Sequence, residues 1–316
     1  MIRRPQNEPV ASSPITGNTL QKSSSHHGSN TDENSSGISN EKTAQKSAPV
    51  KTDFGDLTLR LKKHLGRGGF GQVYFAEVNF QRVAIKVFDL GHSDEDILRV
   101  QPEIAILKEL NHGHIVRFFG TCIANQRHAM VLEYANCGSL RELLKEADDE
   151  LPWPTRRRFG EEISRGLAYL HSRNVVHRDL KSNNVLLFGN DLTVKLADFG
   201  LSVIKNREVS YVSAGLAGAM RWKCKEELRK QARHLSEFKA CDIYSAGMIF
   251  WEITTKKLPF VEMDEIGAAI AICNGKQETI PDTVPEHLKA IIRDCWKPLQ
   301  ERPSAEGLIP RFCAGC

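Results

Sequence analysis

The amino-acid sequence predicts an α+β fold with two lobes: a small antiparallel sheet with one main helix, followed by a larger, mainly helical lobe. Short β-rich runs fill residues 57–88, whereas apolar residues recur at helical spacing after about residue 139. The first fifty residues contain no Phe, Trp or Tyr, so they lack the apolar surface that a core requires. We therefore expect a disordered tail rich in Ser, Thr and Asn over residues 1–52 and an ordered domain over 53–312.

The strand-rich part begins near residue 57. Residues 57–61 alternate apolar and polar side chains, which is typical of a half-buried strand. Residues 72–76 and 82–88 are rich in β-forming types and predict further strands. A serine followed by acidic residues at 93–96 predicts the start of the main helix. That helix continues over the apolar residues Ile104, Leu107 and Leu110.

Helical spacing dominates the second lobe. Further helices are predicted over residues 139–145, 153–173, 242–255 and 285–296. In the helix over residues 153–173, Phe159, Ile163, Leu167 and Leu170 form one apolar face.

Composition and charge exclude several classes of protein. The formal net charge of +4 lacks the clustered basic excess of a nucleic-acid-binding protein. No apolar run approaches the about 18 residues of a transmembrane helix, and residues 1–10 precede no apolar segment of a secretory signal. Eight scattered cysteines then fit reduced thiols in a cytoplasmic protein with access to the nucleus.

The first motif is a glycine-rich loop over residues 66–73, with the pattern G-x-G-x-x-G followed by Val. Glycines let the backbone approach phosphate groups closely and present N–H groups to them. The loop lies between two predicted strands, which disfavours a dinucleotide-binding domain, where a helix would follow. A plain turn remains the alternative for this motif taken alone.

The second motif places Lys86 inside the apolar strand Val83-Ala84-Ile85-Lys86. A buried ammonium group requires an anion, and Glu103, seventeen residues further on in the main helix, is a candidate partner. The alternative is an edge-strand lysine whose ammonium reaches water.

The third and fourth motifs are polar loops next to buried strands. In H-R-D-L-K-S-N-N over residues 177–184, Asp179 can accept a proton, Lys181 can neutralise charge and Asn184 can hold Mg²⁺. Asp198, in Asp-Phe-Gly after a short apolar run, is a plausible metal ligand.

In this order the four motifs resemble the signature set of protein kinases. The resemblance implies the two-lobed kinase fold, with an N-lobe over about 53–132, a hinge over 133–136 and a C-lobe over about 137–312. It implies ATP and Mg²⁺ as cofactors and proteins as substrates, with upstream activators and oligomeric state unspecified. Lys181 in H-R-D-L-K resembles Ser/Thr kinases. Residues 153–171 and 294–304 further resemble the tyrosine-kinase-like group of Ser/Thr kinases, which includes mixed-lineage and Raf-like enzymes.

The resemblance also assigns roles to matching residues. Asp179 deprotonates the substrate hydroxyl, Lys181 lies near the transferred phosphoryl group, and Asn184 and Asp198 hold the metal. Lys86 contacts the α- and β-phosphates and pairs with Glu103. The other ATP-binding residues form the glycine-rich loop, the hinge and the apolar surroundings of adenine, namely Gly66, Arg67, Gly68, Gly69, Phe70, Gly71, Val73, Ala84, Glu133, Ala135 and Leu186.

Further positions match supporting and regulatory residues of the family. Asp242 matches the residue that steadies the H-R-D loop, and Arg302 matches the partner of Glu226 at the end of the activation segment. Candidate phosphorylation sites in that segment are Ser210, Tyr211 and Ser213, which could equally be exposed loop hydroxyls.

Two features depart from the family pattern. Residues 218–226 stand where the family has G-T-x-x-W-M-A-P-E: Ala219 lacks the hydroxyl that bonds the catalytic Asp and Lys, and Cys224-Lys225 replaces Ala-Pro. We expect an altered peptide-binding surface and a looser Asp179. Pro102 directly precedes Glu103, so we expect the main helix to be split or to begin late, with Pro102 in its first turn.

Three functions therefore stay open. The first is an active Ser/Thr kinase, the second a pseudokinase scaffold that binds nucleotide without turnover, and the third a tyrosine or dual-specificity kinase. The last four residues, 313–316, formally fit both a prenylation signal and a C-x-x-C pair, and we expect an ordinary frayed terminus there.

Overall fold

The structure of the protein, a computed structural model, describes residues 53–68, 71–89, 94–146, 151–198, 203–204 and 220–313. All of them belong to the unit Ser47–Cys316, one of the two units into which the chain divides. Several predictions lie outside the described residues: the tail over 1–52, Gly69 and Phe70 of the glycine-rich loop, Ala219, and the candidate phosphorylation sites Ser210, Tyr211 and Ser213.

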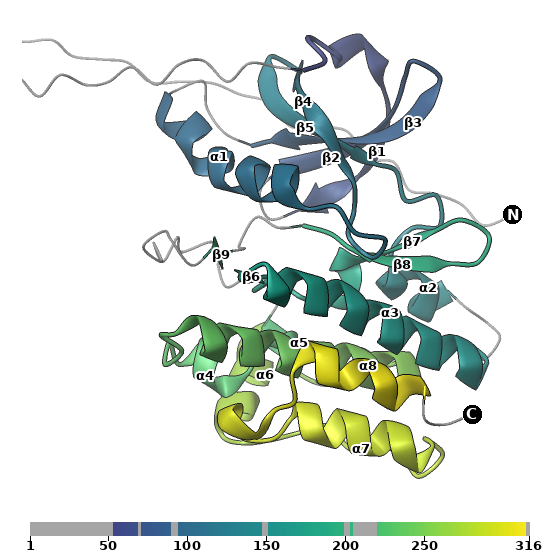
Figure 1. Ribbon diagram of the computed structural model, residues 1–316, viewed down its shortest axis with the longest axis vertical. Helices are drawn as coiled ribbons and strands as arrows, with labels where there is room; N and C mark the ends of the chain where they lie inside the picture. The colour runs from purple at the N-terminus through teal and green to yellow at the C-terminus, as the bar shows by residue number, and fades with distance from the viewer. Residues whose placement is uncertain are drawn as a thin grey trace, which may run out of the picture. The chain divides into compact units, whose positions relative to one another are not determined.

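An antiparallel five-stranded sheet forms the first part of the fold, with α1 (Asp94–Glu109) beside it (Figure 1). Its order is β1-β2-β3-β5-β4. The strands are β1 (Leu61–Gly68), β2 (Gly71–Val78), β3 (Gln81–Phe88), β4 (Phe118–Ala124) and β5 (Arg127–Glu133). The central strand β3 is buried over its last six residues, which include Lys86. The predicted sheet with one main helix is thereby confirmed.

Residues 57–61 do not form the predicted strand. Asp56 Oδ1 accepts hydrogen bonds from the backbone N and the Oγ1 of Thr58, at 2.8 and 2.6 Å. This local turn leads into a 3₁₀ helix over Thr58–Arg60, and Leu59 is left 98% exposed. The prediction was wrong because side-chain hydrogen bonds within a turn can replace the pairing of a strand. The first strand starts only at the last residue of the predicted range.

The main helix begins at Asp94, next to the predicted capping serine, and Pro102 lies in its interior. The expected split or late start is therefore wrong. A proline removes one intrahelical hydrogen bond and costs about 3 kcal/mol. Packing of the following turns outweighs this cost, because it buries the apolar residues Ile104, Ile106 and Leu107.

The second part of the fold is mainly helical. Its helices are α2 (Leu140–Glu146), α3 (Trp153–Ser172), α4 (Lys225–Leu228), α5 (Leu235–Thr255), α6 (Glu265–Cys273), α7 (Glu286–Cys295) and α8 (Ala305–Cys313). The predictions of α2, α3 and α7 are confirmed to within two residues. α5 starts seven residues before the predicted 242, since His234 and Glu237 form a capping box there. Among the described residues, no helix is both long enough and apolar enough to span a membrane.

Two short antiparallel strand pairs lie between the sheet and the helices. β6 (Val175–Val176) pairs with β9 (Val203–Ile204), and β7 (Val185–Phe188) pairs with β8 (Thr193–Leu196) (Figure 1). One buried apolar cluster runs from Phe88 of the sheet through α1 and into the helices as far as Phe312. The sheet and the helical part therefore share a core, and the H-R-D loop lies between β6 and β7, where they meet.

Candidate active site

Lys86 stands where three elements meet. In β3 it pairs across the ladder with Val73 of β2. Its Nζ lies 2.8 Å from Oε1 of Glu103 on α1 and 2.8 Å from Oδ1 of Asp198, which follows β8. The side chains of Lys86 and Glu103 are 5% and 6% exposed. The sheet, the main helix and the loop after β8 are thus joined through one ammonium group.

Burial and neighbouring charges determine the pKa values of Lys86, Glu103 and Asp198. Burial lowers the pKa of Lys86, but the Glu103 and Asp198 carboxylates outweigh it and hold the pKa above its usual range. Burial, helped by the neighbouring Asp198 carboxylate, raises the pKa of Glu103 above its usual value, although the Lys86 ammonium acts to lower it. For Asp198, burial acts to raise the pKa, but the Lys86 ammonium prevails and the pKa lies below its usual value. Lys86 is therefore cationic and Asp198 anionic at neutral pH.

The Asp179 carboxylate is held by two donors. Lys181 Nζ lies 2.7 Å from Asp179 Oδ2, and Asn184 Nδ2 lies 2.9 Å from the same oxygen. Asn184 Nδ2 also donates to the Asp179 backbone O at 2.8 Å. Both side chains act on one oxygen of the carboxylate, which fixes its orientation.

The loop that carries Asp179 rests on Asp242 of α5. Asp242 accepts hydrogen bonds from the backbone N of His177 at 2.8 Å and of Arg178 at 2.9 Å, and its Oδ2 lies 3.0 Å from His171 Nε2. Burial acts to raise the pKa of Asp242, but these bonds outweigh it and the pKa is lowered. Arg178 has a φ of +65°, in the left-handed region. Such strain costs about 1–3 kcal/mol, so an anchor of this kind is needed beside it.

The candidate metal ligands are neighbours. The Ala197 N–H donates to the Asn184 carbonyl at 2.9 Å, which brings Asn184 close to the residue that precedes Asp198. Asp198 has a φ of +66°, again in the left-handed region. Asn184 uses its amide nitrogen on Asp179, so its Oδ1 is the atom with which it can ligate a cation.

The described part of the glycine-rich loop closes back on itself. Gly66 pairs with Val73 and Gly68 with Gly71 in the ladder between β1 and β2. A Cβ atom on Gly71 would lie 2.0 Å from the Val87 carbonyl oxygen, so only glycine fits there. Arg67, by contrast, is exposed, and its guanidinium lies 2.6 Å from Asp89.

The remaining predicted nucleotide residues come from both parts of the fold. Ala84 lies in β3 and is 8% exposed, and Leu186 lies in β7. Glu133 ends β5, and Ala135 lies two residues further on. The Glu133 carboxylate accepts from Lys195 Nζ at 2.7 and 2.8 Å, so this side chain is engaged in an ion pair.

Sequence reasoning missed Glu252, which joins three segments. It is fully buried in α5 and accepts from Ser182 Oγ at 2.9 Å and from Trp222 Nε1 at 2.6 Å, with Arg141 Nη1 at 3.4 Å. Burial raises the pKa of Glu252 to about 7. The signal was available: one acid stands in the apolar run Met-Ile-Phe-Trp-Glu-Ile, and a buried charge requires partners.

Lys223 was also missed. Its Nζ donates to the backbone O of Arg178 at 2.9 Å and to Glu227 Oε1 at 2.5 Å. It stands at the methionine position of the family pattern quoted above. The segment 220–226 therefore bonds the H-R-D loop through this side chain. The same segment ends on Glu226, whose Oε2 lies 2.9 Å from Arg302 Nη2.

The sequence of the chain matches a known protein family. The chain is a member of the family described as protein tyrosine and serine/threonine kinase, whose sequence profile matches residues 59–312. The resemblance indicated by the four motifs is thereby confirmed.

Curated relatives agree with this assignment. The chain is 37% identical over 264 residues to the dual specificity protein kinase shkA of Dictyostelium discoideum, covering 81% of this chain and 49% of shkA. It is 35% identical over 245 residues to the serine/threonine-protein kinase CTR1 of Arabidopsis thaliana, covering 75% of this chain and 29% of CTR1. It is 32% identical over 244 residues to the serine/threonine/tyrosine-protein kinase HT1 of the same plant, covering 75% and 60%. The matched part thus spans about half of shkA and under a third of CTR1.

Proposed function

We propose that the chain transfers the γ-phosphoryl group of ATP to Ser and Thr hydroxyls of protein substrates in a signalling pathway. The observation that carries this proposal is the convergence of Lys181 and Asn184 on one oxygen of Asp179. A carboxylate held in this way has its other oxygen available to orient a hydroxyl group and accept its proton.

We assign each residue a role according to its charge. The oxygen of the substrate hydroxyl bonds the γ-phosphorus while the bond from that phosphorus to the β-phosphate oxygen breaks. Asp179 Oδ1 accepts the proton that the hydroxyl loses. Lys181 neutralises negative charge on the transferred group. Lys86 holds the α- and β-phosphates, and Glu103 positions the Lys86 ammonium. Catalysis in this scheme comes mainly from positioning and charge neutralisation.

Asn184 and Asp198 would hold Mg²⁺. They supply an amide oxygen and an anionic carboxylate, the hard oxygen ligands that Mg²⁺ prefers. Bound Mg²⁺ would supply charge neutralisation on the phosphate oxygens. Asp198 would thus bind the metal and also position Lys86, because its Oδ1 forms an ion pair with the Lys86 ammonium.

The test incubates the full chain with Mg²⁺, γ-labelled ATP and a generic acceptor protein, followed by phosphoamino-acid analysis. Asp179→Asn runs beside it, with Asp191→Asn, an exposed acid in the turn after β7, as the matched control. Label on Ser and Thr that requires Asp179 but not Asp191 supports the proposal.

Dual specificity is the second candidate, because shkA is described as a dual specificity kinase. Additional label on Tyr would favour it. If every variant is silent while nucleotide still raises the melting temperature, the chain is a nucleotide-binding scaffold and the proposal of catalysis is wrong.

A further inference from the structure

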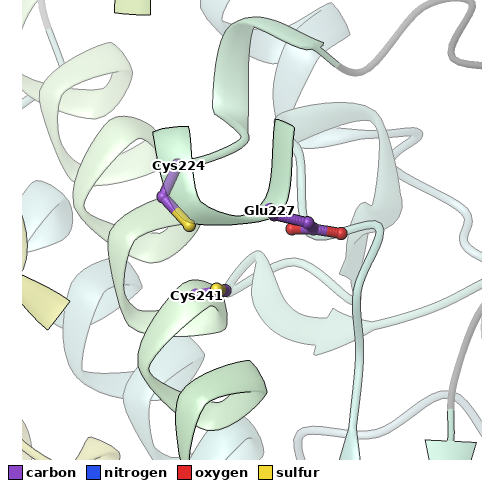
Figure 2. A group of neighbouring side chains, drawn as sticks. All are labelled: Cys224, Glu227 and Cys241. Atoms are coloured by element: carbon purple, nitrogen blue, oxygen red, sulfur yellow. The ribbon is translucent and has the colours of Figure 1, made fainter. Parts of the chain in front are cut away.

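Two buried thiols and one carboxylate lie close together at α4 and α5. Cys224 caps α4, Glu227 lies within α4, and Cys241 lies in α5 (Figure 2). One ligand atom from each of the three lies within 4.8 Å of the other two. Cys224 is 0% and Cys241 2% exposed, and the Glu227 side chain is 12% exposed. We refer to these three residues as the thiol cluster.

We propose that the thiol cluster binds a soft divalent cation of the Zn²⁺ class. Zn²⁺ takes cysteine sulfur at about 2.3 Å and carboxylate oxygen at about 2.0–2.2 Å in tetrahedral geometry. Ligand atoms in such a site lie roughly 3.5–4 Å apart, so side-chain shifts of about 1 Å complete it. Three protein ligands leave the fourth position for water. The sulfur ligands exclude Mg²⁺ and Ca²⁺, which require oxygen.

The surrounding charges fit a divalent ion. The Arg302 guanidinium interacts with Cys224, and Glu226 accepts from Arg302 at 2.9 Å. Lys223 bonds Glu227 on the other side. With both thiols deprotonated, the two thiolates and the two carboxylates of Glu226 and Glu227 carry four negative charges. Arg302, Lys223 and one divalent ion carry four positive charges, so the occupied cluster is neutral together with its neighbours Glu226, Arg302 and Lys223. Each thiol releases one proton when its sulfur bonds the metal.

The location gives such an ion a structural consequence. It would tie α4, at the end of the activation segment, to α5. Glu227 can bind it through Oε2 while Oε1 accepts from Lys223, which in turn donates to the Arg178 carbonyl beside Asp179. Cys224 is also one of the positions where the chain departs from the Ala-Pro of the family pattern, so the cluster is a feature of this chain.

The test titrates Co²⁺ into the full, reduced and metal-free chain, free of any affinity tag, and follows the near-ultraviolet thiolate-to-Co²⁺ charge-transfer band. All variants carry Cys313→Ser and Cys316→Ser, because that terminal pair is a second possible thiol ligand. We expect one Co²⁺ per chain with tetrahedral d–d bands, displaced by Zn²⁺. Cys224→Ala, which restores the family residue, and Cys241→Ala each weaken binding on the order of 100-fold or more. Glu227→Gln weakens it about 10- to 100-fold. Cys122→Ala, which removes a buried thiol in β4, leaves it unchanged.

Circular dichroism and melting temperature establish that each variant is folded. The proposal is wrong if the parent chain gives no charge-transfer band, or if the band survives both Cys224→Ala and Cys241→Ala. It is also wrong if Co²⁺ gives no band while hydrogen peroxide consumes two thiols, because the pair is then a disulfide-forming pair. The readout involves no phosphoryl transfer, so its failure and the failure of the proposed kinase activity are separate results.

Discussion

At the scale of single residues, Glu252 connects the H-R-D loop, the segment 220–222 and α2 through one buried carboxylate. Its donors are Ser182, Trp222 and Arg141. These bonds act to lower the pKa, but burial prevails and the pKa stands at about 7 against an ordinary value of 4.5. The ionised form is therefore the costly one in the folded protein.

Glu252 predicts a specific pH dependence of stability. Between pH 4.5 and about 7 the native state holds the proton that the unfolded state has lost, so the contribution of this group is full below 4.5 and disappears as pH rises through 7. We expect the free energy of unfolding of the native chain, relative to Glu252→Gln, to rise on the order of 3 kcal/mol as pH falls through this range. Urea titrations at several pH values measure it, and Glu262→Gln, at an exposed acid, is the control. A difference independent of pH contradicts the account.

Lys223 predicts a kinetic effect. Replacing it by Met, the residue of the family pattern, removes the donor to the Arg178 carbonyl beside Asp179. We expect kcat for phosphoryl transfer to fall about 10- to 100-fold with KM for ATP unchanged, because the loop loses position while the nucleotide contacts remain. Steady-state kinetics measure both constants.

The control for this prediction is Lys225→Met at the neighbouring exposed lysine, which should keep kcat. Lys223→Arg retains a donor and should recover part of the rate. An unchanged kcat in Lys223→Met would show that the Lys223 hydrogen bond does not position Asp179.

The catalytic candidates were visible in the sequence because each lies in a short contiguous motif. Asp179, Lys181 and Asn184 occupy six consecutive positions, so a single loop brings them together. Glu252 belongs to no such motif, and Lys223 lies where the chain departs from its family pattern. Their partners are far away along the chain, at Ser182 and Arg178, and only the packing of α5 and the 220–226 segment against the loop creates these contacts.

At the scale of elements, the helices α2, α3 and α7 were predicted well, whereas two segments whose structure depends on competing interactions were mispredicted. α3 and α7 follow their apolar periodicity closely. The turn at Asp56 and the proline inside α1 were mispredicted for one shared reason: the outcome depended on energies outside the local pattern. At Asp56 a side-chain hydrogen bond prevailed, and in α1 tertiary packing prevailed.

The β2–β3 pair predicts a steric effect at Gly71. Its Cβ position lies 2.0 Å from the Val87 carbonyl oxygen, so Gly71→Ala must push the two strands apart. We expect a loss of about 1–3 kcal/mol in the free energy of unfolding, measured by chemical denaturation. Gly113→Ala is the matched control, since nothing lies within 4 Å of its Cβ position. Equal stability of the two variants would show that the close approach is not maintained.

At the scale of the whole molecule, a few charged groups connect segments that are distant in sequence. Lys86 joins β3, α1 and the loop after β8, and Asp242 joins α5 to the H-R-D loop. The shared apolar core supplies the rigid support for both. The family pattern predicted the Lys86–Glu103 pair and the role of Asp242, whereas the Lys86–Asp198 ion pair and the thiol cluster required the folded chain.

The central claim is that this assembly transfers phosphate with Asp179 as the proton acceptor. The most direct measurement is the single-turnover rate from pre-bound Mg²⁺ and ATP to an acceptor protein, for the parent, Asp179→Asn and Asp191→Asn. We predict a fall of about 10²- to 10⁴-fold in Asp179→Asn alone, with nucleotide affinity retained in all three. Equal rates in the parent and Asp179→Asn, or no transfer by a parent that binds nucleotide, would contradict it.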